Sequence, residues 1–152
     1  MTESRFTILP DAAATEAFGA WLAGLARPGD VITLSGPLGA GKTSIARGFL
    51  ARIGLEDEAP SPSFAIVQPY APPEVQMPVL HVDLYRIEEP EEIEELGLDE
   101  ALFDSILLIE WPERATGRWP EALALTLTIQ PDGARRLTAE MPPAWEARWR
   151  SI

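Results

Sequence analysis

The chain contains no cysteine, no asparagine and only one lysine. Without cysteine there are no disulfide bonds, thiolate metal sites or cysteine nucleophiles. Without asparagine there is no N-glycosylation site. No apolar run approaches the roughly 20 residues of a membrane-spanning helix. The first residues also lack the basic flank and long apolar stretch of a secretory signal. We therefore expect a cytoplasmic protein. Hydrophobic residues make up 46% of the chain, which is enough for a packed core.

Positive charge is also scarce. Twelve lysines and arginines stand against 24 acids, which gives a net charge of −12. Such a surface repels nucleic-acid phosphates over most of its area, so strong direct binding of RNA or DNA is not expected. Eight of the acids lie between Glu88 and Glu100. This stretch is either a solvated helix face or a docking surface for a basic partner.

The single lysine, Lys42, lies in the segment GPLGAGKT, residues 36–43. The pattern G-x-x-x-x-G-K-T is that of the phosphate-binding P-loop, and it stands here between a predicted strand and a predicted helix, as the motif requires. Lys42 is expected to reach the β- and γ-phosphates of a nucleotide, and the Thr43 hydroxyl to hold Mg²⁺. The predicted nucleotide-binding residues of this segment are Gly36, Pro37, Leu38, Gly39, Ala40, Gly41, Lys42, Thr43 and Ser44.

Apolar periodicity and turn signals predict an α/β fold around this loop. Strands are expected at residues 5–9, 30–35, 64–70, 79–85, 106–109, 123–129 and 135–140. Helices are expected at about 11–26, 43–53, 90–97, 98–103 and 143–150. The Asp132–Gly133 pair is typical of a hairpin turn. Residues 1–152 are therefore predicted to form a single P-loop NTPase-like domain, with a mostly parallel central sheet flanked by helices and a C-terminal antiparallel hairpin.

Hydrolysis needs acids on the metal side of the nucleotide and a group that positions water. Asp83 lies near the end of the apolar segment VLHVDLY, and Glu110 ends the run ILLIE. A carboxylate at the carboxyl end of a buried strand points into the crevice where nucleotides bind in α/β sheets. Both acids are predicted to lie near Mg²⁺, although each could instead face solvent at the rim. His81 is more typical of a packed or hydrogen-bonded core residue than of a catalyst, and Trp111 belongs either to the core or over the site.

The choice of nucleotide follows from what the chain lacks. Proteins with this loop that are specific for GTP commonly read guanine with an Asn/Thr-Lys-x-Asp element. With no asparagine and no second lysine, the chain cannot contain that element. ATP is therefore the expected nucleotide, with Mg²⁺ as its metal.

Several segments together resemble the TsaE family, the small bacterial P-loop ATPases of tRNA threonylcarbamoyladenosine biosynthesis. The segments are GPLGAGKT (36–43), SPSF (61–64), HVDLYR (81–86), LGLDE (96–100) and IEWPE (109–113). Their order and spacing cover about half of the chain. The DLYR and IEWPE segments are far more specific than the P-loop alone.

The resemblance implies slow hydrolysis of ATP and action through a heterodimer of partner proteins that installs threonylcarbamoyl on a tRNA adenosine, so that tRNA is met only indirectly. It implies that Lys42 binds phosphates, that Thr43, Asp83 and Glu110 surround Mg²⁺, and that Glu110 also orients water. Trp111 matches a functionally important tryptophan of the family. Two positions depart from the family pattern, because Ser63 stands where threonine is usual and Pro37 replaces a common aspartate. Ser63 keeps the hydroxyl and loses only a methyl group, so the resemblance implies that it keeps its role in nucleotide binding.

Two other functions fit a P-loop. A small-molecule kinase would need a lid and an acceptor pocket, and 152 residues show no convincing lid segment. A nucleotide-gated binding module would need the loop but no turnover.

Overall fold

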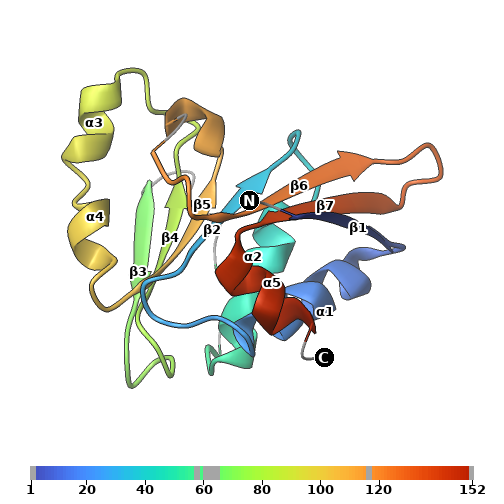
Figure 1. Ribbon diagram of the computed structural model, residues 1–152, viewed down its shortest axis with the longest axis horizontal. Coiled ribbons are helices and arrows are strands. Elements are labelled where there is room, and N and C mark those ends of the chain that lie inside the picture. The colour runs from blue at the N-terminus through green and yellow to red at the C-terminus, as the bar shows by residue number, and fades with distance from the viewer. Residues whose placement is uncertain (1–2, 57–58, 60–65, 116–117, 151–152) are drawn as a thin grey trace.

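Seven strands form one mixed sheet in the order β1-β7-β6-β2-β5-β4-β3 (Figure 1). The structure is a computed structural model that describes residues 3–56, 59, 66–115 and 118–150. The strands are β1 (Glu3–Leu9), β2 (Val31–Ser35), β3 (Val67–Tyr70), β4 (Val79–Asp83), β5 (Ile106–Glu110), β6 (Leu123–Ile129) and β7 (Arg135–Met141). The helices are α1 (Ala12–Ala23), α2 (Lys42–Arg52), α3 (Pro90–Glu94), α4 (Leu98–Ala101) and α5 (Pro143–Arg150), with a 3-10 turn, η2 (Pro112–Ala115).

The α/β class is confirmed, and the expectation of a mostly parallel sheet is confirmed only in part, for the four central strands. Strands β6, β2, β5 and β4 are parallel neighbours. The pairs β1–β7, β7–β6 and β4–β3 are antiparallel. Residues 71–78 join β3 to β4, and this connection is too short for a parallel crossover, which needs a dozen or more residues. At the other edge β1 pairs with β7, which no local sequence signal indicates. The predicted C-terminal hairpin of β6 and β7 is confirmed.

Most predicted elements are present, with shifts at their ends. Asp11 caps α1 as expected, since its Oδ1 accepts a hydrogen bond from the Ala14 N–H at 2.8 Å. The helix ends at Ala23, before the expected Ala26. Strand β4 ends at Asp83 because the chain turns there, and the Tyr85 N–H donates to the Asp83 side chain at 2.8 Å. Residues 64–65 of the expected third strand lie outside the described residues.

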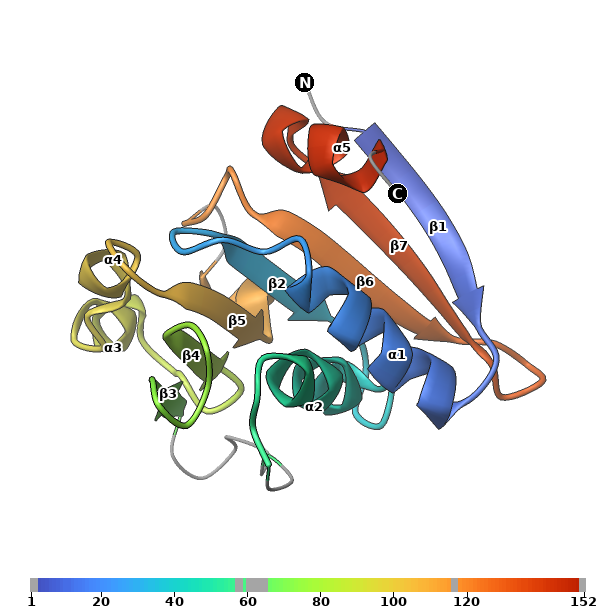
Figure 2. The ribbon, with the colours of Figure 1, turned by 90° about the horizontal axis from the view of Figure 1, so that it is seen from below.

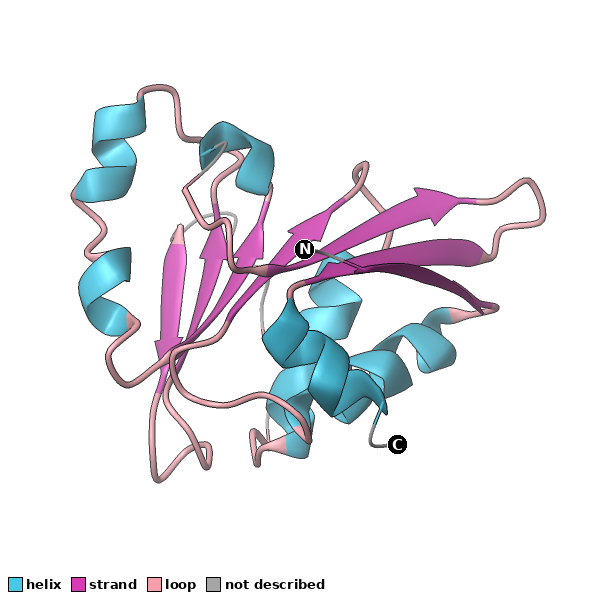
Figure 3. Cartoon of the chain, viewed as in Figure 1, coloured by secondary structure: helices cyan, strands magenta, loops and turns pink. Residues whose placement is uncertain are grey.

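Helices cover both faces of the central strands (Figure 3). Alternate residues of β5 face opposite sides, as in any strand. Ile106 and Leu108 pack in the cluster that includes residues of α1 and α2, and Leu107 and Ile109 in the cluster that includes residues of α3 and α4. Along β6 the burial alternates, with Thr126 and other outward residues exposed, as expected where an antiparallel sheet has one face in water.

Helices α1 and α2 pack side by side against one face of the sheet (Figure 2). Their backbones nearly touch at two glycines. A Cβ added at Gly19 would lie 2.0 Å from the Ile45 carbonyl oxygen, and one at Gly48 would lie 1.9 Å from the Glu16 carbonyl oxygen. This close approach fixes α2, and with it the loop that precedes it, against the sheet.

Part of the acidic stretch has a structural role. Glu92 accepts hydrogen bonds from the backbone N–H groups of Glu88 and Glu89 at 2.8 and 2.9 Å, at the start of α3. Glu94 and Asp99 both bind the Arg118 guanidinium, at 2.8 and 3.1 Å. These three acids therefore fit the first alternative given for the stretch, a solvated helix face. The second alternative, a docking surface for a basic partner, stays a prediction. No helix in the described ranges is long and apolar enough to cross a membrane.

Candidate active site

The segment with the P-loop sequence pattern, residues 36–43, lies in the connection between the carboxyl end of β2 and the start of α2. Gly36, Gly39 and Gly41 have φ angles of 147°, 78° and 110°, a range that favours glycine. At Gly36 space also matters, because an added Cβ would lie 2.7 Å from the Leu127 carbonyl oxygen. No side chain caps the start of α2 at Gly41. Its first backbone N–H groups therefore suit an anion such as phosphate.

A pocket of about 230 Å³ lies over this loop. Residues 38–44 line it together with Asp83, Glu110 and Trp111. Most predicted site residues thus lie around one space, while Gly36 and Pro37 are not part of its lining. Ser63 lies outside the described residues. Larger hollows exist elsewhere, such as one of about 480 Å³ between the end of α1 and α5. None of the described residues lining that hollow is an acid, so it lacks the carboxylates that lie beside the loop.

Three neighbouring parallel strands bring the acids to the loop. In the register of the sheet, Glu110 pairs with Leu34 on β2 and with Asp83 on β4. Because the carboxyl ends of parallel strands lie at the same edge, both carboxylates reach the crevice beside the loop. Both side chains are buried, with Asp83 5% and Glu110 3% exposed. The sequence-based placement of both acids at strand ends beside the loop agrees with this geometry, and the alternative of a solvent-facing rim position is wrong.

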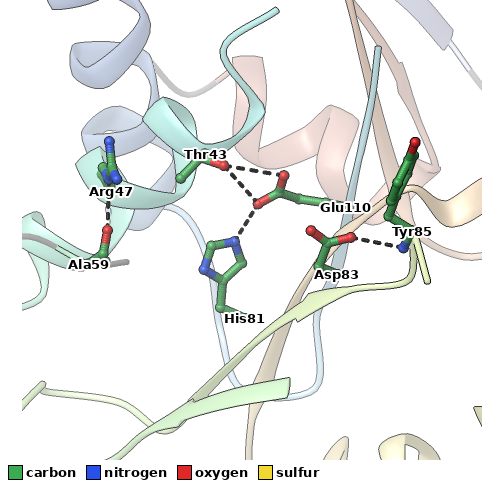
Figure 4. A network of polar contacts seen from close by, with 7 residues as sticks. All are labelled: Thr43, Arg47, Ala59, His81, Asp83, Tyr85 and Glu110. Atoms are coloured by element: carbon green, nitrogen blue, oxygen red, sulfur yellow. Dashed lines mark hydrogen bonds and ion pairs between the residues drawn. The ribbon is translucent and has the colours of Figure 1, made fainter. Parts of the chain in front are cut away.

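Thr43 and Glu110 face each other across the crevice (Figure 4). The Thr43 hydroxyl lies 3.4 Å from Oε1 and 3.3 Å from Oε2 of Glu110, a weak contact shared between both oxygens. Asp83 uses Oδ1 to accept from the Tyr85 N–H. A hydroxyl and two carboxylates are oxygen ligands of the kind that Mg²⁺ prefers.

His81 lies beneath this group and is fully buried. Its Nε2 is 2.6 Å from Glu110 Oε2, and no partner within the described residues reaches its Nδ1. A carboxylate only accepts hydrogen bonds, so Nε2 carries the proton and donates. The expectation of a hydrogen-bonded core histidine is confirmed, but its partner is the candidate catalytic acid.

Lys42 is buried and lies close to the loop that it follows. Its ammonium donates to the Gly36 carbonyl and stands 3.5 Å from the centroid of the Trp111 ring, a cation–π distance. Burial lowers the pKa of Lys42, and the nearby acids Glu110, Glu113 and Asp83 oppose that effect. The ammonium is therefore held among negative charges in a space that excludes most water.

Trp111 covers the crevice and is not simply part of the core. Its backbone has a φ of 61°, which is uncommon for a residue with a side chain. The ring packs against Tyr85, with centroids 4.9 Å apart, as well as over Lys42. Both alternatives left open by the sequence hold in part, because the ring lines the pocket and also packs against the cluster that includes Leu107 and Ile109.

The oxygen atoms of Thr43, Asp83 and Glu110 would fit Mg²⁺ only together with a bound nucleotide. Within the described ranges, no three His, Cys, Asp or Glu side chains gather as a metal site. Asp83, Glu110 and Thr43 would therefore share the ion with phosphate oxygens and water. This is the usual arrangement for Mg²⁺, which keeps several waters and few protein ligands.

The family described as "Threonylcarbamoyl adenosine biosynthesis protein TsaE" matches residues 9–138 of the chain. That range includes the loop, both acids and Trp111. The chain belongs to the TsaE family. The resemblance read from the sequence motifs is thereby confirmed.

Two TsaE proteins illustrate the similarity. One from Bacillus subtilis (strain 168) is 37% identical over 126 residues, which cover 82% of this chain and 77% of that protein. One from Haemophilus influenzae is 41% identical over 108 residues, or 70% and 67% of the two chains. Both are called tRNA threonylcarbamoyladenosine biosynthesis protein TsaE. The fold also matches the crystal structure of Bacillus subtilis YdiB, with a TM-score of 0.83, 27% identity and coverage of 99% and 95%.

Sequence reasoning missed two polar residues near the loop of this TsaE-family chain. Glu113, in the IEWPE segment, accepts a hydrogen bond from the Ser35 hydroxyl at 3.1 Å. Arg135, on β7, donates to the loop carbonyls of Gly39 and Ala40. Glu113 could have been found from its motif, but Arg135 is 95 residues from Ala40 in sequence and no local pattern links them.

Proposed function

We propose that this TsaE-family protein binds and slowly hydrolyses ATP with Mg²⁺, and that it serves threonylcarbamoyladenosine modification of tRNA through a partner protein complex in the cytoplasm. One observation supports it above all: Lys42, Thr43, Asp83, Glu110 and Trp111 lie around one pocket on the P-loop. The names of the TsaE relatives supply the pathway.

Each residue around the pocket would have a separate role in binding or hydrolysis. The N–H groups at the start of α2 and the Lys42 ammonium would bind the phosphates. When bound, Mg²⁺ would supply positive charge against the phosphate oxygens. Thr43, Asp83 and Glu110 would hold that ion. Glu110, fixed by His81, would also orient the attacking water, and Trp111 would limit the access of solvent to Lys42.

The charge of the chain favours action through partners. At a net charge of −12, a direct strong contact with tRNA is unfavourable. A partner pair that holds the tRNA and installs the threonylcarbamoyl group removes this conflict. The ATPase would then act on the state of that complex and would not transfer the group itself.

The test is phosphate release by the purified protein with ATP and Mg²⁺, alone and with the partner heterodimer. We expect slow release alone, faster release with the partners, and loss of release in Lys42→Ala. ATP should bind more tightly than GTP. Transfer of phosphate to a small acceptor would instead make the protein a kinase.

A complementation experiment separates turnover from binding. In cells that lack the protein, we expect neither Lys42→Ala nor Glu110→Gln to restore the tRNA modification. If Glu110→Gln restores it while Lys42→Ala does not, the protein acts as a nucleotide-gated module without turnover.

A further inference from the structure

The guanidinium of Arg135 binds three backbone carbonyls on two different loops. Nε donates to the Ala40 oxygen at 3.0 Å and Nη2 to the Gly39 oxygen at 3.1 Å, both in the phosphate-binding loop. Nη1 donates to the Gly133 oxygen, in the turn between β6 and β7. A planar fork with five N–H groups can satisfy several carbonyls at once, whereas the compact ammonium of lysine cannot match that geometry.

The position of these carbonyls affects what the loop can bind. A P-loop binds phosphate when its N–H groups converge on one side. In a trans peptide the N–H and C=O of one plane point in opposite directions. The peptide whose carbonyl belongs to Ala40 carries the N–H of Gly41, the N-cap residue that precedes α2. Holding the Ala40 carbonyl outward therefore keeps the Gly41 N–H on the opposite side.

Independent packing contacts place the same hairpin under the loop. An added Cβ at Gly36 would lie 2.7 Å from the Leu127 carbonyl oxygen, and one at Gly41 would lie 3.8 Å from a Leu127 methyl carbon. Leu127 belongs to β6 and Arg135 to β7. Strand β6 thus packs against the loop through Leu127, and strand β7 binds the loop carbonyls through Arg135.

We propose that Arg135 is a positioning residue that holds the phosphate-binding loop in its binding conformation, and that the β6–β7 hairpin is part of the nucleotide site. The inference deepens the proposed function and rests on it, because it assigns a residue outside the P-loop motif to ATP binding. Arg135 acts through the backbone of the loop, and its effect requires the fork geometry as well as the charge.

The test compares Arg135→Ala, Arg135→Lys and the control Arg136→Ala. Arg136 is the next residue on β7 and is exposed on the other face of the strand. Its guanidinium carbon lies 4.2 Å from the centroid of the Phe6 ring. Hydrogen bonds from a charged donor are strong enough that we expect Arg135→Ala to weaken ATP binding about tenfold or more. Arg135→Lys should restore little of this loss, and Arg136→Ala should bind like the wild type. Arg135→Ala binding within twofold of the wild type would overturn the inference, as would full affinity in Arg135→Lys.

A second measurement needs no nucleotide. Amide hydrogen exchange at residues 39–42 should be faster in Arg135→Ala than in the wild type and unchanged in Arg136→Ala. Should Arg135→Ala fail to fold, Arg135→Lys carries both measurements. If the wild type binds no ATP, the proposed function fails, while the exchange rates still decide whether Arg135 orders the loop. If ATP binds and exchange is unaffected by Arg135, only the present inference fails.

Discussion

The Nε2 of His81 lies 2.6 Å from Oε2 of Glu110 in the buried layer beneath the loop. This contact fixes one carboxylate oxygen, and the Thr43 hydroxyl lies at similar distances from Oε2 and Oε1, 3.3 and 3.4 Å. A core histidine therefore sets the orientation of the acid on which hydrolysis is proposed to depend.

Replacing His81 should lower turnover more than it weakens ATP binding. A hydrogen bond to a charged group contributes about 1.5–3 kcal/mol, which corresponds to about tenfold or more in rate. We expect His81→Leu to lower kcat by about tenfold or more with a nearly unchanged KM for ATP. His81→Gln keeps a hydrogen-bond donor, so its kcat should lie between those of His81→Leu and the wild type. Steady-state phosphate release over a range of ATP concentrations measures both constants, and a wild-type kcat in His81→Leu would contradict the role.

Removing a proposed Mg²⁺ ligand should abolish most metal-dependent hydrolysis. Thr43→Ala removes the hydroxyl and Asp83→Ala removes a carboxylate from the same crevice, so each should lower phosphate release by about 100-fold or more, the scale seen when a positioned catalytic group is lost. Thr7→Ala, on the exposed edge strand β1, is the matched control and should release phosphate normally. Near-normal turnover in both site variants would refute the metal assignment.

The backbone of Trp111 predicts an unusual order of stability. At a φ of 61° a Cβ costs roughly 1–2 kcal/mol, and glycine avoids this cost. Trp111→Gly should therefore be more stable than Trp111→Ala by about 1 kcal/mol. This order is the reverse of the usual one, because alanine normally stabilises a protein relative to glycine by reducing the entropy of the unfolded chain. Urea denaturation of the two variants measures the difference. Greater stability of the alanine variant would show that the backbone relaxes at this position.

The contact between α1 and α2 predicts opposite outcomes at two glycines. Gly48→Ala places a methyl group 1.9 Å from the Glu16 carbonyl oxygen and should destabilise the fold by about 2 kcal/mol or more, because the two backbones must separate. At Gly24 the nearest atom to an added Cβ is 3.4 Å away and φ is −69°, so Gly24→Ala should be neutral or slightly stabilising. Thermal unfolding of both variants checks the pair, and equal losses would contradict the packing.

Acid should weaken the start of α3 through Glu92. The backbone N–H groups of Glu89 and Glu88 lower the pKa of this carboxyl by hydrogen bonding to its charged form. Because the pKa of Glu92 is lower in the folded state than in the unfolded state, its charged carboxylate stabilises the fold at pH values above the usual pKa of a glutamate. This stabilisation is lost as the pH falls through the pKa of the folded state. Glu92→Gln should thus be less stable than the wild type at pH 7 and equally stable at acidic pH.

Denaturation at the two pH values tests this linkage. Glu91→Gln, on the same helix, is the control, since it leaves the two bonds to Glu92 in place. A stability deficit of Glu92→Gln that persists unchanged at acidic pH would exclude a role for the charge.

The sequence predicts what local pattern and motif chemistry determine. The loop between β2 and α2, the acids at the ends of β4 and β5, the Asp11 cap and the β6–β7 turn all depend on neighbouring residues or on strand direction, and the structure agrees with their predicted positions. The pairing of β1 with β7 and the contact of Arg135 with Ala40 join residues more than 90 positions apart. Such contacts depend on tertiary packing, which a single sequence does not reveal.

The position of the hairpin has a consequence for the order of folding. Strand β1 pairs with β7 through contacts such as Glu3 with Met141, and closing so long a stretch of chain is slow because its entropy must be lost first. The ribosome completes residues 36–43 well before residue 135. A nascent chain would therefore carry the whole P-loop motif without the arginine that orders it. We expect ATP binding to begin late in synthesis, and fragments ending before β7 to bind ATP weakly even where α2 has formed.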